Sequence, residues 1–283
     1  MPKVSIVFDR LRIEEKMLLK QATEMGIQVE MIDAKSSHIN TEKTTLDFGD
    51  GALERCISYF RGLHYTAYLE FLNVPVINKL AVASICGNKM LMTLKLRKHN
   101  VPTPSTFFAF TRESAIDMAD TAKYPLVIKP LVGSWGRGVA KISDRETLEA
   151  VTEAREISDG PYDRIYYLQK LVKRPPRDIR VITVGEYAIA AMYRTSSDGF
   201  KTNIALGADP QMCKITKEME DLAIKSSKAV GGGILGVDMM EDKERGLVAH
   251  EVNNTVEFKG ISKVTDKNIP KIMLEFLLES TRK

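Results

Sequence analysis

The stretch that most constrains the fold is LVIKPLVGSWGRGV, residues 126–139. An apolar run ends at Lys129, Gly133, Gly136 and Gly138 follow at close spacing, and the next segment, VAKIS, has the composition of a strand. The glycine motifs of P-loop and Rossmann proteins open into a helix, and a P-loop also ends in G-K-[ST], so neither motif fits. The pattern therefore predicts two strands joined by a glycine-rich flap.

The residues of this flap suit a nucleotide. Glycine lets main-chain N–H groups approach a phosphate closely, and a lysine at the end of a strand can reach a phosphate as a point charge. The stretch therefore predicts a nucleotide site in which Lys129 contacts a phosphate. The alternative is a glycine-rich surface turn beside a lysine that lies in solvent.

Strand and helix patterns alternate along the first part of the chain, which predicts a parallel sheet with crossover helices. Hydrophobic spacing places strands at 3–8, 27–33 and 74–78 and helices at 14–26 and 54–73. Farther along, it predicts helices at 88–100, 114–122, 145–157, 217–232 and 268–283, strands at 164–172, 234–240 and 246–252, and a hairpin that turns at Gly185-Glu186. We predict an α/β chain in which a second region begins near Gly87.

Oxygen-bearing side chains recur on the last two predicted strands. Glu251 and Asn253 are two residues apart, so they point to one face of their strand. If the turn between the strands centres on Glu244-Arg245, antiparallel pairing places Asp238 opposite Glu251. Mg²⁺ takes such oxygen ligands, usually together with waters and phosphates. The alternative is an edge hairpin with solvated carboxylates.

The predicted hairpin carries a third group of charged residues. Asp178 and Arg180 share a face by the same alternation, and Arg194 ends the partner strand. Guanidinium groups bind planar anions at two points, which suits a phosphoryl group in transfer. The alternative is a structural ion pair between Asp178 and Arg180.

Composition excludes several classes of protein. The net charge of +4, from 41 basic and 37 acidic residues, is too small for a nucleic-acid-binding stripe. No apolar stretch approaches the roughly 18–20 residues that span a bilayer, so no membrane partner is expected. The three cysteines are far apart, which indicates a reducing compartment, and we expect a cytoplasmic protein.

Five motifs, in this order, resemble the ATP-grasp superfamily: NKMLMTLKLRKHNVPTPST, GSWGRGV, DIRVITVG, VGGGILGVD and HEVNNTVEFK. Within it, they are most similar to the group of ligases that glutamylate ribosomal protein S6. They are more similar still to the ligases that attach an amino acid to the small acidic amino-group carrier protein (LysW-like) of lysine and arginine biosynthesis. The resemblance implies an α/β chain with an ATP-grasp fold of three domains: an N-terminal α/β domain at 1–86, a small central α+β domain with the flap at 87–167, and a C-terminal α+β domain with an antiparallel sheet and the Mg²⁺ site at 168–283.

The resemblance also implies site residues. The implied ATP contacts are Lys89 and Lys129 at the phosphates, Ser134, Trp135, Gly136 and Arg137 in the flap, Gln169, Lys170, Leu171 and Val172 against adenine, and Asp178 at the ribose. The implied ligands of two Mg²⁺ ions are Asp238, Glu251 and Asn253, and Arg180, Arg194 and Asn203 would stabilise an acyl phosphate. Lys170 and Asn254 depart from the family pattern, which often has an acidic residue and a histidine there.

The implied reaction is an ATP-dependent ligation of a carboxylate to an amine. ATP phosphorylates the C-terminal glutamate side chain of the carrier, and the amino group of L-glutamate or L-2-aminoadipate displaces phosphate. Relatives that use aminoadipate usually have an arginine where this chain has Leu206, which favours glutamate. One methylene is worth only about 1–3 kcal/mol in an apolar pocket, so dual activity stays open.

Two other interpretations stay open. One is glutamylation of a ribosomal protein tail, as in the parent group. The other is a nucleotide-binding regulatory module without catalysis, against which the three oxygen-bearing residues of the last strands argue. The resemblance further implies a homodimer or homotetramer.

Overall fold

Apolar residues on both faces of the first strand organise the N-terminal part of the chain. The computed structural model describes residues 1–158, 160–195 and 209–282. Strands β1 (Lys3–Phe8), β2 (Gln28–Asp33), β3 (Gly51–Glu54) and β4 (Val76–Ile77) form a parallel sheet in the order β2-β1-β3-β4. Helix α2 (Tyr59–Phe71) contacts the side of this sheet that includes Val7, and α1 (Ile13–Glu24) packs on the other side against Val4 and Ile6.

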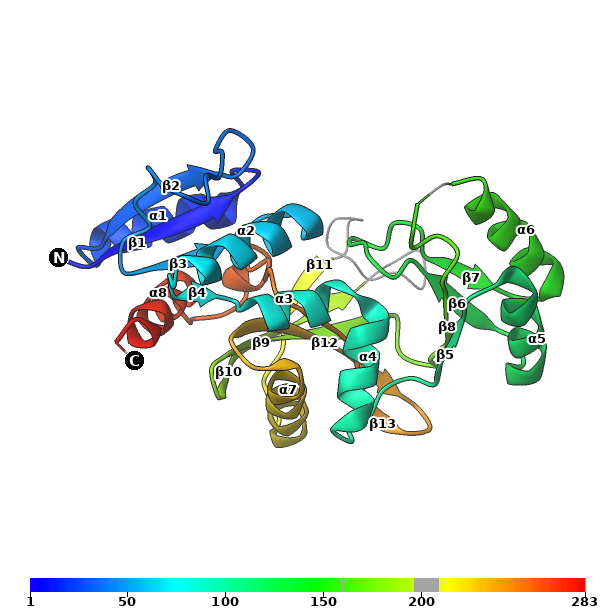
Figure 1. Cartoon of the computed structure of the whole chain (residues 1–283). Coiled ribbons are helices and arrows are strands. Elements are labelled where there is room, and N and C mark those ends of the chain that lie inside the picture. Colours follow the sequence, from blue (N-terminus) through cyan, green and yellow to red (C-terminus); the bar gives the residue numbers. More distant parts are fainter. Residues whose placement is uncertain (159, 196–208, 283) are drawn as a thin grey trace.

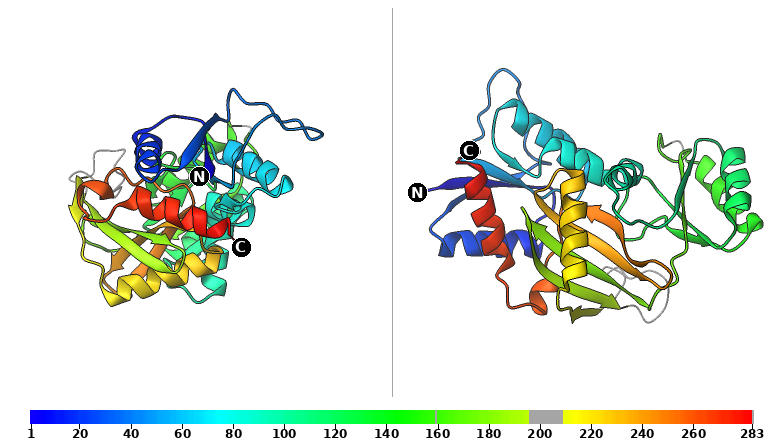
Figure 2. Two further views of the ribbon diagram at one scale, coloured as in Figure 1. Left: turned by 90° about the vertical axis from the view of Figure 1, so that its left-hand side faces the viewer. Right: turned by 90° about the horizontal axis from the view of Figure 1, so that it is seen from below.

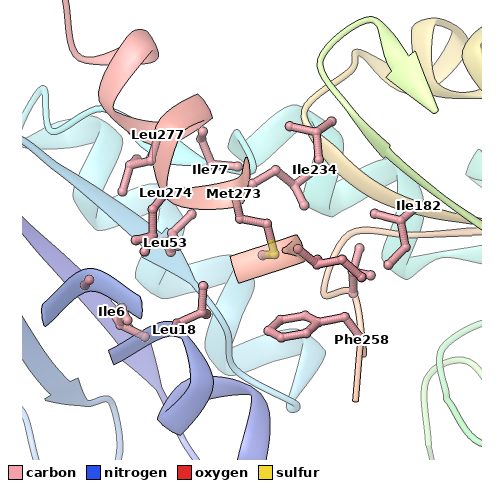
Figure 3. Close-up of a cluster of buried hydrophobic side chains, with 14 of the residues drawn as sticks. Ile6, Leu18, Leu53, Ile77, Ile182, Ile234, Phe258, Met273, Leu274 and Leu277 are labelled. Atoms are coloured by element: carbon pink, nitrogen blue, oxygen red, sulfur yellow. The ribbon is translucent and has the colours of Figure 1, made fainter. Parts of the chain in front are cut away.

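The C-terminal helix returns to this N-terminal sheet. Helix α8 (Ile269–Ser280) contacts α1, β3 and β9, and Figure 2 shows it, in red, between the N-terminal and C-terminal sheets. Its Leu274 and Leu277 join Ile6, Leu18 and Leu53 in one buried cluster, drawn in Figure 3. The two ends of the chain therefore belong to one hydrophobic core.

The flap lies in a separate small body, on the right of Figure 1. Its sheet is antiparallel, in the order β5 (Thr106–Ala109), β8 (Tyr166–Lys170), β6 (Leu126–Lys129) and β7 (Ala140–Ile142). Helices α5 (Arg112–Ala122) and α6 (Arg145–Glu156) pack together on it. Because β6 and β7 pair directly, the predicted strand, loop and strand are confirmed.

The C-terminal sheet is antiparallel and larger. Its order is β11 (Asp209–Met212), β10 (Tyr187–Thr195), β9 (Arg177–Val184), β12 (Ile234–Asp242) and β13 (Gly246–Asn253). Helices α3 (Leu80–Gly87), α4 (Lys89–Lys98) and α7 (Lys217–Val230) share one hydrophobic cluster with it. Residues 80–98 therefore pack on the C-terminal sheet, while the domain boundaries drawn from the sequence stay predictions.

Several short elements differ from the sequence prediction. A helix was expected from residue 54, but Gly51–Glu54 is a strand and the helix begins at Tyr59. All four residues of this strand are buried, so it lacks the alternation that marks a half-exposed strand. Strands β5 and β11 and helix α3 were not predicted either. The hairpin at Gly185 is confirmed, with Val184 paired to Tyr187. Among the described residues, no helix is long and apolar enough to cross a membrane.

Candidate active site

The sheet β1–β4, the sheet β5–β8 and the sheet β9–β13, each with its helices, form an N-terminal body, a flap body and a C-terminal body. A cavity of about 830 Å³ is lined by residues of all three bodies. Arg12 and Ser58 of the N-terminal body line one part of it, and strand ends of the other two bodies line the rest. Asn203 and Leu206 lie outside the described residues. The structure brings every other predicted site residue to this cavity: Lys89, Lys129, Ser134, Trp135, Gly136, Arg137, Gln169, Lys170, Leu171, Val172, Asp178, Arg180, Arg194, Asp238, Glu251 and Asn253.

Lys129 is a buried cation held by hydrogen bonds. Its side chain ends β6, is 6% exposed, and donates from Nζ to Gln169 Oε1 at 2.7 Å. Gln169 in turn donates to Thr106 Oγ1 at 2.9 Å and to the Tyr167 hydroxyl at 3.1 Å. The alternative of a strand-end lysine in solvent is therefore wrong. The network fixes the ammonium group where it meets the cavity.

Burial changes the acid–base behaviour of this lysine. Desolvation is the largest effect on Lys129, and it lowers the pKa to about 7. Glu251 opposes this shift, whereas Lys89 and Arg174 add repulsion in the same direction as burial. An anionic ligand bound beside this buried ammonium would offset the repulsion from the neighbouring cations.

His250 is a site residue that the sequence prediction missed. Its Nδ1 lies 3.2 Å from Nζ of Lys129. Strict alternation places residue 250 on the face opposite Glu251, so the pattern gave no signal for it. A β-bulge makes the difference, because Asp238 pairs with Glu251 while Met239 pairs with Ala249 and leaves His250 without a register partner.

The flap has the backbone geometry that its glycines allow. Gly133, Gly136 and Gly138 have φ values of 151°, 68° and 66°, which favour glycine. Lys89 Nζ donates to the Gly133 carbonyl at 2.8 Å. Trp135 also has a positive φ, of 59°, and its ring lies 5.1 Å from the Arg137 guanidinium carbon. The flap thus lines the cavity, and a hydrogen bond from Lys89 of α4 holds its first glycine.

Two arginines and two aspartates form one buried network. Arg194 binds Asp178 through two bonds of 2.7 and 2.8 Å, and Arg180 binds Asp238 through two bonds of 2.7 Å. Arg194 Nη2 also lies 3.0 Å from Asp238 Oδ2. Burial acts to raise the pKa of Asp238, but Arg180 and Arg194 hold it well below its usual range.

The order of the strands explains these pairs. Strand β9 lies between β10 and β12, so Asp178 faces Arg194 on one side and Arg180 faces Asp238 on the other. The Asp178–Arg180 pair weighed from the sequence is replaced by these cross-strand pairs. The alternation of side chains along the strand correctly placed Asp178 and Arg180 on one face. It does not predict which residue of a neighbouring strand each one contacts.

The oxygen-bearing residues predicted for the metal lie together. Asp238 pairs with Glu251 as predicted, although the turn pairs Asp242 with Gly246 and the bulge supplies the extra residue. Asn253 Nδ2 lies 3.4 Å from Asp238 Oδ2, and Glu251 Oε1 lies 3.3 Å from Lys89 Nζ. The described residues contain no metal-type group of three or more His, Cys, Asp or Glu side chains. The predicted set fits Mg²⁺ as two carboxylates and one amide oxygen.

The predicted adenine segment is the end of β8 and the residues after it. Lys170 donates its main-chain N–H to the Ser105 carbonyl at 2.8 Å, and its Nζ reaches the Lys123 carbonyl at 2.6 Å. Its ammonium is therefore anchored on its own body. At Asn254, the other departure from the family pattern, the main-chain carbonyl accepts a bond of 2.7 Å from Asn78 Nδ2.

Three bodies around one cavity, with a glycine-rich flap between two antiparallel strands, define the ATP-grasp class of ligases. A RimK domain ATP-grasp protein from Sphaerobacter thermophilus has this fold, with a TM-score of 0.79 at 22% identity over 98% of this chain and 99% of that one. The chain matches the RimK-like ATP-grasp domain over residues 72–277 and the LysX preATP-grasp domain over residues 4–85. The chain belongs to the RimK-like ATP-grasp family.

Curated relatives cover almost the whole chain. The α-aminoadipate–LysW ligase LysX of Saccharolobus solfataricus is 38% identical over 96% of this chain and 99% of its own length. The glutamate–LysW ligase ArgX of Sulfurisphaera tokodaii is 29% identical over 99% and 100%. The resemblance and the fold class predicted from the sequence are confirmed. The chain is an ATP-dependent ligase, and its family implies the use of ATP and Mg²⁺.

Proposed function

We propose that the chain joins the α-amino group of L-2-aminoadipate to the C-terminal glutamate side chain of a LysW-type carrier protein. The observation that carries this proposal is the difference in similarity between the two kinds of relative. Two LysX proteins are 38% and 36% identical over 96% and 99% of this chain, against 29% for ArgX proteins. The preference for glutamate drawn from Leu206 is not confirmed. Glutamate is therefore the second candidate, alone or as an additional substrate.

In the proposed reaction, different residues of the cavity bind ATP, hold Mg²⁺ and stabilise the acyl phosphate. Lys89 and Lys129 bind the phosphates of ATP, residues 134–137 cover them, and residues 169–172 hold adenine through the main chain. Mg²⁺, as one or two ions on Asp238, Glu251 and Asn253, supplies positive charge against the phosphates when bound. Arg180 and Arg194 neutralise the carboxylate as it becomes an acyl phosphate. The amine then attacks the activated carbonyl, and phosphate leaves.

The arrangement needs no nucleophilic side chain. Cys56, Cys86 and Cys213 are free and buried. Burial raises the pKa of Cys56 and of Cys86 beyond the usual range of a thiol, so neither is a thiolate at neutral pH. Direct transfer between bound substrates therefore accounts better for this site than a covalent enzyme intermediate does.

Mass spectrometry of the carrier tests the choice of amino acid. Purified chain, ATP, Mg²⁺ and a LysW-type carrier are incubated with aminoadipate, with glutamate, or with both in equal amounts. We expect a mass increase of one aminoadipate residue, and an excess of that product in the mixture. Equal products would indicate a dual enzyme, and a glutamate product alone would contradict the proposal. A ribosomal protein tail in place of the carrier tests the parent-group reaction.

Arg180→Lys tests the proposed role of the arginine pair. Lysine keeps the charge but lacks the planar fork that binds an anion at two points. We expect kcat to fall about a hundredfold, since the loss concerns charge that develops during transfer. The KM for ATP should stay close to that of the wild type, because Lys89 and Lys129 are unchanged. A raised KM with an unchanged kcat would assign Arg180 to ATP binding instead.

A further inference from the structure

The centre of the flap is held by a residue outside the predicted site. Trp135 has a φ of 59°, a conformation that a bulky residue keeps only where its surroundings hold it. Its indole Nε1 donates to Glu257 Oε1 at 3.0 Å. The ring in turn lies against the Arg137 guanidinium. Glu257 therefore contacts the tryptophan of the flap, and the tryptophan in turn contacts Arg137.

Glu257 stands on a rigid support. Its neighbours Val256 and Phe258 are 1% and 0% exposed and belong to the core that includes the N-terminal sheet and α8. The side chain of Glu257 itself is 36% exposed and lines the cavity. Because the residues on both sides are locked in the core, the Glu257 carboxylate is presented to the flap from a fixed position.

The same carboxylate oxygen of Glu257 also contacts Arg12 of the N-terminal body. Arg12 Nη1 lies 3.5 Å from Glu257 Oε1. Arg12 also binds Glu15 through two bonds of 3.1 and 2.7 Å, and Glu15 is completely buried beside Arg55, 3.2 Å away. The chain of contacts runs from the flap through Glu257 and Arg12 into the start of α1.

Other contacts hold the flap at its two ends. Lys89 binds the Gly133 carbonyl, and Arg155 Nη2 donates to the Gly138 carbonyl at 2.9 Å. Within the loop, the Arg137 N–H donates to the Ser134 carbonyl at 3.3 Å and the Val139 N–H to the Gly136 carbonyl at 3.4 Å. Ordering a loop rich in glycine is nevertheless entropically unfavourable. The side-chain bond from Trp135 to Glu257 adds a restraint at a part of the loop that lines the cavity.

We propose that Glu257 is a positioning residue that closes the flap: it holds Trp135 over the cavity and, together with Arg12, ties the flap to the N-terminal body. Closure around ATP then depends on the correct placement of all three bodies. The inference deepens the proposed function, on which it rests for the presence of ATP. It does not depend on which amine or carrier is used.

The chain carries its own reporter for this contact, because Trp135 is its only tryptophan. The experiment measures Trp135 emission and the Kd of AMPPNP with Mg²⁺ in the full chain, without amine or carrier. Glu257→Leu removes the acceptor and the charge. Glu257→Gln keeps an amide oxygen for the indole N–H and removes only the charge. Glu186→Gln is the matched control, since Glu186 is 74% exposed and pairs with Lys228 at the β9–β10 turn.

For Glu257→Leu we expect emission shifted towards that of a solvent-exposed indole and a Kd weaker by about tenfold, the usual effect of losing a hydrogen bond to a charged group. Glu257→Gln should bind AMPPNP within about threefold of the wild type, because the hydrogen bond to the indole remains. The control should match the wild type in both measurements. Wild-type emission and Kd in Glu257→Leu would overturn the proposal.

A second variant covers the case in which Glu257→Leu does not fold, as judged by circular dichroism. Trp135→Phe keeps the ring and removes the N–H donor, and its Kd is measured by calorimetry. A Kd equal to that of the wild type overturns the proposal, and a weaker Kd supports it. If AMPPNP binding depends on Glu257 but no amino acid reaches the carrier, the positioning role holds and the proposed function fails.

Discussion

Replacing Lys129 with methionine is expected to weaken ATP binding while making the folded chain more stable at pH 6. The loss of a charged hydrogen-bond donor to phosphate corresponds to about a tenfold to hundredfold weaker Kd. The gain arises because burial holds the pKa of Lys129 at about 7 instead of 10.5, so its charge destabilises the fold by a few kcal/mol at pH 6. Because Gln169 loses its hydrogen-bond donor in the variant, the net gain in stability is smaller by about 1–3 kcal/mol.

The sign of the stability effect depends on pH. Below pH 7, both the folded and the unfolded chain carry the proton on Lys129, so the wild type bears the full penalty. Between pH 7 and 10.5 only the unfolded chain keeps it, and the penalty declines as pH rises. Thermal unfolding of both proteins should therefore show a larger advantage for the variant at pH 6 than at pH 9.

An exposed lysine provides the control. Lys98, on α4, is exposed, and Lys98→Met should change neither the Kd of AMPPNP nor the pH dependence of unfolding. An advantage of Lys129→Met that grows from pH 6 to pH 9 would contradict the explanation by burial. An unchanged Kd would remove Lys129 from the phosphate site.

Asp238→Asn should abolish Mg²⁺-dependent turnover and strongly destabilise the fold. The wild-type network of Asp178, Asp238, Arg180 and Arg194 has two charges of each sign. The variant leaves one positive charge uncompensated in a buried site, which is expected to lower the free energy of unfolding by about 3–5 kcal/mol. Urea denaturation measures this difference, and release of ADP measures turnover.

The effect of Asp238→Asn on stability depends on pH in the opposite direction to that of Lys129→Met. The arginines depress the pKa of folded Asp238, so its carboxylate stabilises the fold above the pKa of the unfolded chain, about 4. This stability is lost as pH falls towards the lower folded value. The difference between wild type and Asp238→Asn should thus be constant above about pH 5 and should narrow below about pH 4.

A double variant separates stability from chemistry. Asp238→Asn with Arg180→Met again balances the charges, with Asp178 and Arg194 left as a pair. We expect it to recover much of the lost stability and none of the turnover. Recovery of turnover would remove both Asp238 as a metal ligand and Arg180 as a catalytic group.

The amino-acid pattern predicted those parts of the site that depend on local order. The apolar run before Lys129 and the glycines after it identified the flap and its strands. Alternation put Glu251 and Asn253 on one face, and the pairing with Asp238 is as predicted. The pair is right although the turn is centred differently, because the bulge at His250 shifts the register by one residue.

Contacts between distant elements could not be predicted in this way. Arg180 meets Asp238, and not Asp178, because β9 lies between β10 and β12. Glu257 meets Trp135, 122 residues away, because the flap and the segment after β13 line the same cavity. Helix α8 completes a core that begins at the other end of the chain.

The sequence by itself therefore determined the longer elements, the shared face of Glu251 and Asn253, and the family of ligases. The tertiary structure alone decided which charges are paired, where His250 points, and what holds the flap. The physical reason is that periodicity records whether a face is buried or exposed. The partner that covers the face is chosen by packing of the whole chain, to which distant segments contribute together.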